Sequence, residues 1–217
     1  MRTQTIDNKS AAKSIPRYER FILILLVIGI QMLYIPSSNQ VSGGIELKLP
    51  IDIFPILPVW VVPYVLCMPL WLVGIFYATF KMEDRLFRAF LASFFLASLS
   101  AVSVFVFFPT YVKAATFPSK DIFSILLQSI HTGAGRYDAF PSGHVYITAL
   151  LAFFYSRWYP KYRYLWAAIA VIVSLSTIFT GQHYFLDVLG GLAIAILSYH
   201  FGFLWAGYSE TKVTASK

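Results

Sequence analysis

Two short motifs in the second half of this 217-residue chain place histidines beside groups that suit an anion. The first is the turn Phe140-Pro141-Ser142-Gly143-His144, which opens an apolar run. If a helix begins here, its first backbone N–H groups and the positive end of its dipole point at one spot and favour an anion there. His144 then stands beside that spot and can give or take a proton near neutral pH.

The second motif contains His183 and Asp187, four residues apart. On a helix this spacing puts both side chains on one face, where the carboxylate can hold Nδ1–H of the imidazole and leave Nε2 as a nucleophile. With His144 protonating a leaving oxygen, these residues predict phosphoryl transfer through a phospho-histidine. Two alternatives stay open: a purely structural His–Asp pair, and a zinc site of two histidines and an aspartate. We expect no metal, because the turn offers anion donors rather than ligands.

Membrane helices are the elements that must position these residues. The chain is 58% hydrophobic and only 12% charged, and its apolar runs approach the roughly 20 residues that cross a bilayer. These features predict an all-α polytopic membrane protein with six transmembrane helices, at residues 21–35, 64–80, 89–108, 142–158, 164–180 and 184–205. The prolines in residues 51–63 disfavour a regular helix and predict a re-entrant or interfacial segment before the second span. In the long loop 109–141, residues 122–130 are expected to form a short amphipathic helix.

The basic residues predict the orientation. Most of the 17 Lys and Arg residues fall in residues 1–20, 81–88 and 157–163 and in the C-terminal tail. Since such residues favour the cytoplasm, we expect cytoplasmic tails at 1–20 and 207–217 around a membrane catalytic domain at 21–206. His144 and His183 then lie on the extracytoplasmic side, in what we expect to be the plasma membrane.

The net charge is +7, but the basic residues are dispersed along the chain, which argues against nucleic-acid binding. The first apolar run could also be a signal peptide, but no clean cleavage site follows it.

The two motifs together resemble those of the type-2 phosphatidic acid phosphatase superfamily of membrane lipid phosphatases. That resemblance implies a six-helix core, no metal, His183 as nucleophile, and His144 and Asp187 as its partners. The family's first motif is Lys, six residues and Arg-Pro; here Lys113 is followed after six residues by Lys120-Asp121. Its third motif starts Ser-Arg, whereas this chain has Ser176-Thr177 and lacks the arginine that clamps phosphate. In this respect the segment looks more like the inositol phosphorylceramide synthase branch.

Several residues are candidates for binding the phosphate in place of that arginine. Lys113 is favoured by its spacing, and Arg136 and Lys120 are the other cations of the long loop, although Lys120 could instead pair with Asp121. Thr177 offers at most one uncharged donor. Ser142 could donate to phosphate, cap the helix that follows, or do both, and Gly143 belongs to the same turn.

The expected function is a lipid phosphatase that removes phosphate from a lipid phosphate or diphosphate and needs no cofactor. The first alternative is a head-group phosphotransferase, similar to inositol phosphorylceramide or phosphatidylinositol phosphate synthases, in which an alcohol replaces water. The second is a lipid-binding or transport protein without activity. Of the remaining histidines, we expect His131 at the surface and His200 packed against a neighbouring helix.

Overall fold

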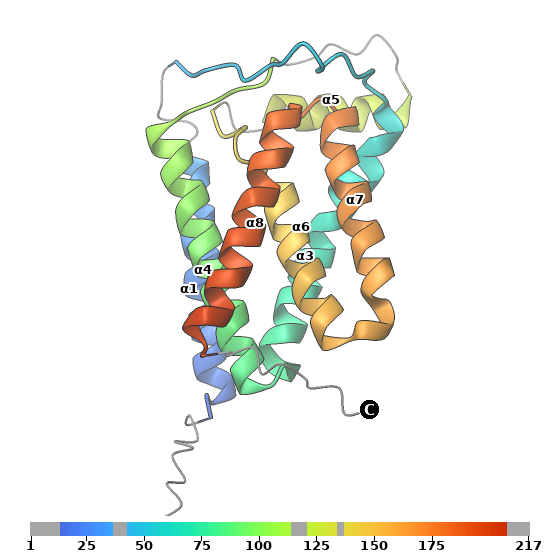
Figure 1. Cartoon of the computed structure of the whole chain (residues 1–217). Helices are drawn as coiled ribbons and strands as arrows, with labels where there is room; N and C mark the ends of the chain where they lie inside the picture. Colours follow the sequence, from blue (N-terminus) through green and yellow to red (C-terminus); the bar gives the residue numbers. More distant parts are fainter. Residues whose placement is uncertain (1–13, 37–42, 114–120, 134–136, 208–217) are drawn as a thin grey trace, which may run out of the picture.

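Long helices run side by side in the computed structural model of the chain, which describes residues 14–36, 43–113, 121–133 and 137–207 (Figure 1). The α-helices are α1 (Arg17–Met32), α3 (Val61–Lys81), α4 (Asp84–Phe107), α5 (Ile122–Gly133), α6 (Gly143–Trp158), α7 (Arg163–Phe179) and α8 (Phe185–Trp205), with two 3-10 turns, η1 (Pro58–Trp60) and η2 (Pro160–Tyr162). Within the described ranges, β-structure is limited to isolated bridges. The predicted all-α class is confirmed. The predicted tails lie mostly outside the described residues.

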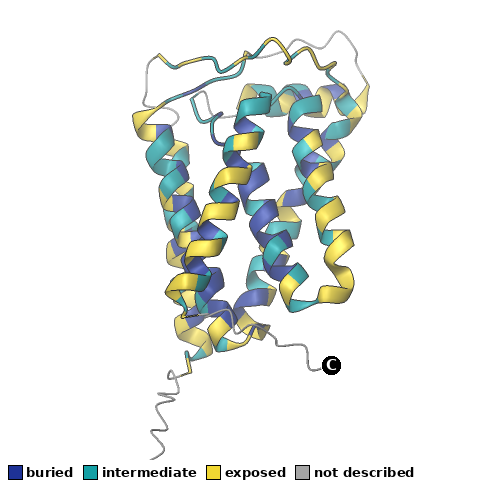
Figure 2. Ribbon diagram, viewed as in Figure 1, coloured by how far each residue is buried: buried dark blue, intermediate teal, exposed yellow. Residues whose placement is uncertain are grey.

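Five stretches are long and apolar enough to cross a membrane: residues 17–36, 58–81, 84–107, 160–179 and 185–205. The remaining predicted span, the fourth in chain order, corresponds to α6. This helix has only 16 residues and is about 24 Å long, short of the roughly 30 Å of a bilayer core. It can be short because it contacts α3, α4, α7 and α8, so that other helices cover it. In Figure 2, buried residues follow α6, whereas exposed ones follow the outer sides of α7 and α8.

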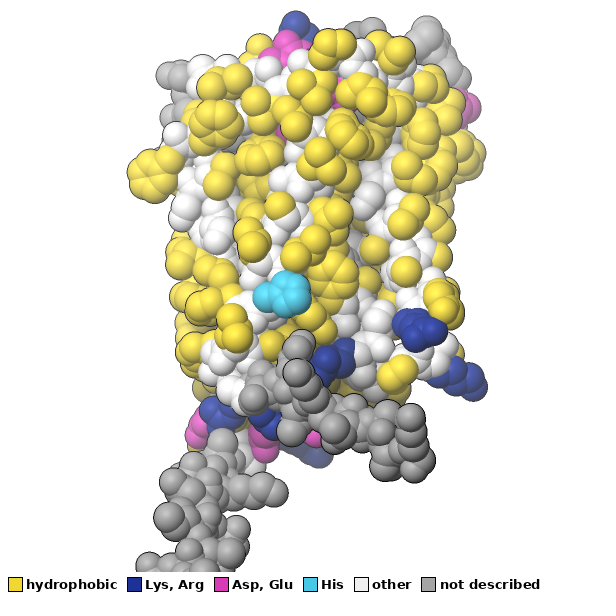
Figure 3. Space-filling view, in the orientation of Figure 1, with side chains coloured by type: hydrophobic (Ala, Val, Ile, Leu, Met, Phe, Trp, Pro, Cys, Tyr) yellow, Lys and Arg dark blue, Asp and Glu magenta, His cyan; other side chains and the backbone are white. Residues whose placement is uncertain are grey.

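The outer surface of the bundle is apolar along its length. Large hydrophobic side chains such as Leu197, Val171 and Leu72 are exposed. Figure 3 shows hydrophobic side chains over the middle of one face, with several Lys and Arg side chains near its lower end. An apolar surface of this kind is more stable in contact with lipid than with water, because its exposure to water costs free energy. The chain is an integral membrane protein.

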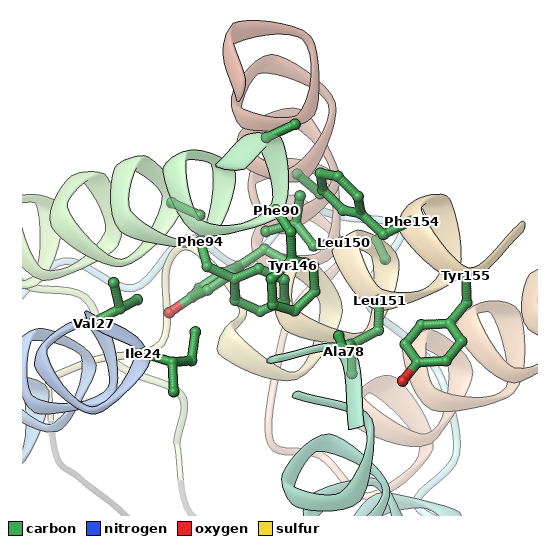
Figure 4. Close-up of a cluster of buried hydrophobic side chains, with 14 of the residues drawn as sticks. Ile24, Val27, Ala78, Phe90, Phe94, Tyr146, Leu150, Leu151, Phe154 and Tyr155 are labelled. Carbon is green, nitrogen blue, oxygen red and sulfur yellow. The ribbon is translucent and has the colours of Figure 1, made fainter. Parts of the chain in front are cut away.

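The core lies where α4 and α6 face α1, α3 and α8 (Figure 4). Phe90 of α4 packs edge-on against Phe154 of α6, with ring centroids 5.2 Å apart. At the lower end, the buried Arg20 of α1 pairs with Asp84 at 2.5 Å and donates to the carbonyl of Met82 at 2.6 Å. This pair fastens α1 to the connection between α3 and α4.

The proline-rich stretch before α3 crosses the opposite end of the bundle (Figure 1). The N–H of Leu57 donates to the carbonyl of Phe179 at 2.8 Å, and Oδ1 of Asp52 accepts the N–H of Phe185 at 2.8 Å. The stretch is therefore an extended strap that holds the end of α7 and the start of α8, and it does not re-enter the bundle as a hairpin. Helix α3 begins at Val61, three residues earlier than expected, because the 3-10 turn leads straight into it.

Candidate active site

His183 lies in the tight turn between α7 and α8. The carbonyl of Thr177 accepts the N–H groups of both Gln182 and His183, each at 3.1 Å. Gly181 makes this turn possible, since its φ of 66° is in the left-handed region that glycine adopts without strain. The end of α7 therefore fixes the backbone of His183, and its side chain is 9% exposed.

Asp187 sits one turn into α8, where its carboxylate performs two tasks. Oδ2 accepts the backbone N–H of Tyr184 at 2.8 Å, which caps the helix, and lies 3.5 Å from Nδ1 of His183. Nδ1 of His183 and Oδ1 of Asp187 are both buried without a hydrogen-bond partner among the described residues. A small rotation of the imidazole would join them, so the pair is arranged to orient the ring.

The turn before α6 is fastened directly to this pair. The N–H of Ser142 donates to the backbone carbonyl of Asp187 at 2.9 Å. Glycines on α8 allow that approach: a Cβ at Gly191 would lie 2.7 Å from the carbonyl oxygen of Ser142, and one at Gly190 would lie 2.2 Å from the ring of Phe140. Two motifs forty residues apart in the chain therefore meet because two glycines remove the steric barrier between them.

His144 faces His183 across a short gap. The centroids of the two imidazoles are 6.1 Å apart. The ring of His144 stacks on Tyr64 at 4.0 Å and leans on Trp71 at 5.2 Å, and its Nε2 is buried without a hydrogen-bond partner in the described chain. The two rings are therefore neighbours at one site, as a nucleophile and a proton donor acting on one ligand must be.

Both histidines line a cavity of about 720 Å³. Its polar lining includes Asp138 and Gln182, next to the histidines, whereas α1, α3 and α4 contribute mostly apolar side chains such as Ile24, Leu72 and Phe94. Figure 1 places the start of α6 below the upper ends of α7 and α8. A molecule with a charged head and an apolar tail matches this lining.

Of the two turn residues predicted to bind phosphate, Gly143 lines this cavity and Ser142 is not among the lining residues. Ser142 occupies the N-cap position of α6 but makes no capping hydrogen bond, and its buried Oγ has no partner among the described residues. The first N–H groups of α6 lack an acceptor within the helix. The hydroxyl of Ser142 is therefore not used as a cap.

Lys113, the first choice among the cations, is not among the residues that line the cavity. Its side chain is 72% exposed, and Nζ lies 2.8 Å from Oε2 of Glu46. The hydrogen bond with Glu46 raises the pKa of Lys113, and the same bond lowers the pKa of Glu46. Oε1 of Glu46 also accepts the hydroxyl of Tyr184 at 2.6 Å. In the described part of the chain, Lys113 thus reaches the site through Glu46 and Tyr184. Lys120 and Arg136 lie outside the described residues.

Thr177 does not replace the missing arginine. Its hydroxyl donates to the carbonyl of Ser174 at 2.8 Å, within its own helix. What Thr177 contributes is its carbonyl, which holds the backbone of His183 as described above. In the described part of the chain, no three His, Cys, Asp or Glu side chains gather as a metal site would require.

Three further residues belong to this end of the molecule. His131, which we expected at the surface, is half-buried, lines the cavity and contacts the carbonyl of Thr180 through Nε2 at 2.9 Å. Burial lowers the pKa of His131. Asp138 lines the cavity, and Glu46 anchors Lys113. Sequence reasoning missed the position of His131 and the role of Glu46, because both depend on contacts between segments far apart in the chain.

The sequence is similar to known proteins. A sequence model described as "PAP2 superfamily" matches residues 59–201, which include α3 to α7, most of α8 and both motifs. Over 65 residues the chain is 34% identical to the catalytic subunit aur1 of inositol phosphorylceramide synthase from Schizosaccharomyces pombe, a match that covers 30% of this chain and 15% of that protein. No solved structure matches the chain. The chain belongs to the PAP2 superfamily.

Proposed function

We propose that this protein is a membrane enzyme that removes phosphate from a lipid phosphate or diphosphate through a phospho-histidine at His183. One observation carries the proposal: two imidazoles stand 6.1 Å apart at the polar end of a cavity whose remaining walls are mostly apolar. The family to which the chain belongs supports a phosphatase or phosphotransferase.

The reaction has two steps. Nε2 of His183 attacks phosphorus and forms an N–P bond while the P–O bond to the lipid breaks, and the lipid oxygen takes a proton from His144. Water then attacks phosphorus, gives a proton back to His144, and releases His183 as phosphate leaves. Asp187 stabilises the positive charge that develops on the imidazole of His183.

Negative charge on the phosphoryl oxygens needs donors. We assign this role to the N–H groups of Gly143 and His144 and to the hydroxyl of Ser142, which stand together at the start of α6. Lys113 is a weaker candidate, since Glu46 already neutralises it. Lys120 and Arg136 remain candidates from the sequence alone.

Transfer to an alcohol is the second candidate function. It is supported by the similarity to a subunit of inositol phosphorylceramide synthase, although that similarity covers only a small part of that protein. The chemistry differs only in the second step, where a hydroxyl group rather than water attacks the phospho-histidine and a new phosphodiester forms.

We further propose that the site faces the extracytoplasmic side of the plasma membrane. The basic segments 81–88 and 157–163 lie at the end of the bundle opposite the histidines (Figure 1). Because Lys and Arg favour cytoplasmic loops, this arrangement puts the cavity mouth outside.

Purified protein in detergent tests the proposal with phosphatidic acid, diacylglycerol pyrophosphate and a polyprenyl diphosphate, each with EDTA present. We expect turnover that survives EDTA and is lost in His183→Ala. His200→Ala is the matched control, since His200 is exposed on α8 and lies outside the cavity. Release of free phosphate indicates hydrolysis, and a new lipid phosphodiester indicates transfer. Unchanged turnover in His183→Ala rules out the mechanism, and binding without any turnover supports the non-catalytic alternative.

A further inference from the structure

The cavity carries an acidic group that the proposed reaction does not use. Among the described residues that line it, Asp138 is the only carboxylate, and none of them is Lys or Arg. A site for a phosphate usually gathers positive charge, because the transferred group spreads its negative charge over several oxygens. A carboxylate at this position therefore needs a reason.

The backbone of Asp138 is held firmly in place. Its strand-like segment pairs with Thr110, which in turn pairs with Ile45. The N–H of Ala139 donates to the carbonyl of Thr110 at 3.1 Å, and the N–H of Phe140 donates to its hydroxyl at 2.7 Å. Thr110 is buried. Three segments of the chain thus fix the point from which the carboxylate enters the cavity.

Several titratable side chains surround Asp138. It shares the cavity lining with His183, Tyr34, Tyr64, His144, His131 and Tyr111. No ion pair with Lys or Arg reaches it from within the described ranges. Burial raises the pKa of Asp138, and the positive form of His183 acts in the opposite direction.

We propose that Asp138 is a specificity-determining residue that makes the site prefer a phosphate group with one negative charge over one with two. The reason is Coulombic: a like charge at short range in a partly dry cavity disfavours each additional negative charge on the ligand.

This preference indicates a class of substrate. A lipid phosphodiester carries one negative charge at every pH of interest, whereas a phosphomonoester gains its second charge above about pH 6. Asp138 therefore favours a lipid whose phosphate is already esterified to a head group. The inference rests on the proposed phospho-histidine at His183 and favours the second candidate function, transfer to an alcohol, since cleavage of such a lipid leaves the head-group phosphate on the enzyme, ready for transfer.

The test compares two lipids that release the same product. Short-chain phosphatidylglycerol, a diester, and phosphatidic acid, a monoester, both yield diacylglycerol when His183 attacks, so release in a single turnover needs no known acceptor. We expect the ratio of diester to monoester kcat/KM at pH 7.5 to fall at least about tenfold in Asp138→Asn and to be retained in Asp138→Glu. On phosphatidic acid, the activity of the natural protein should fall more steeply than that of Asp138→Asn as pH rises through the second ionisation of the lipid.

Glu19→Gln is the control for the loss of one negative charge. Glu19 is exposed on α1 and is not among the cavity-lining residues, and its Oε1 accepts the hydroxyl of Tyr18, which an amide oxygen also accepts. We expect no change in the ratio for this variant. An unchanged ratio and pH profile in Asp138→Asn overturns the inference while leaving the phospho-histidine mechanism intact.

A binding measurement separates the two proposals if turnover is absent. The increase in melting temperature that each lipid gives the purified protein is measured for the natural protein and for Asp138→Asn. We expect Asp138→Asn to increase the stabilisation by phosphatidic acid more than the stabilisation by phosphatidylglycerol at pH 7.5, because the carboxylate repels two charges more strongly than one. Equal stabilisation by phosphatidic acid rejects the role of Asp138, whatever the outcome for His183.

Discussion

Oδ2 of Asp187 lies 3.5 Å from Nδ1 of His183 and at the same time accepts the N–H of Tyr184 at 2.8 Å. One carboxylate thus caps the helix that carries it and stands ready to orient the imidazole. The two tasks can be separated, because an asparagine keeps an oxygen for the cap but loses the charge that favours an imidazolium.

Asp187→Asn should therefore lower kcat strongly and change stability little. We expect a loss of about 10²- to 10⁴-fold in kcat, by analogy with the general contribution of an oriented acid–base pair. Asp187→Ala should lose activity to the same degree and, in addition, about 1 kcal/mol of stability as the cap is removed. Steady-state kinetics and thermal unfolding in detergent measure the two effects. Full activity in Asp187→Asn would contradict the orienting role.

The two histidines should differ in their response to the leaving group. With a good leaving group, as in p-nitrophenyl phosphate, the leaving oxygen needs no proton, so His144→Ala should recover the first step, seen as a burst of p-nitrophenol. The second step, in which His144 accepts a proton from water, should stay slow. His183→Ala should remain inactive with either substrate, since the nucleophile is gone. Equal loss with both substrates in His144→Ala would show that the ring has some other role.

Close packing at Gly191 should be essential for bringing the motifs together. Gly191→Ala places a Cβ 2.7 Å from the carbonyl oxygen of Ser142 and 2.9 Å from Cβ of Val145, so α8 must move away from the turn. We expect a stability loss of about 1–3 kcal/mol together with loss of activity. Gly29→Ala in α1 is the control, because nothing lies within 4 Å of its added Cβ. If both variants behave alike, the close contact is not what positions the site.

The ion pair of Glu46 and Lys113 should stabilise the folded protein only within a defined pH range. Pairing lowers the pKa of Glu46, so its stabilisation is present above the ordinary value of 4.5 and is lost as pH falls through the lowered folded value. Pairing raises the pKa of Lys113, so its stabilisation is present below 10.5 and is lost as pH rises through the raised value. Glu46→Gln should therefore differ from the natural protein in melting temperature only inside this window. The difference should be small and should shrink with salt, because the pair is exposed.

The orientation can be tested with single cysteines. Ile53 in the strap is 84% exposed, and Lys161 at the opposite end is also exposed, whereas the natural Cys67 is buried and gives little background. Ile53→Cys should react with an impermeant maleimide in intact cells, and Lys161→Cys only after permeabilisation. The reverse pattern would place the site in the cytoplasm.

Much of this protein is determined by its sequence alone. The length and apolarity of its runs decide that it is an all-helical membrane protein, since a bilayer permits few other spanning structures. The spacing of His183 and Asp187 predicts that the two side chains meet, and they do, with His183 in the turn before α8 rather than on the helix itself. The family can be recognised from the two motifs, because each motif is a short run of residues that is identified without knowledge of contacts with distant segments.

Only the tertiary structure decided what surrounds those motifs. Helix α6 has only 16 residues, and it can be this short because neighbouring helices cover it. A hydropathy pattern does not record such contacts. The salt bridge that occupies Lys113 depends on Glu46, 67 residues away in the chain. Asp138 enters the cavity because Thr110 fixes its backbone. Contacts of this kind arise from the packing of segments remote in sequence, and the side chains that make them carry no local signal of their partners.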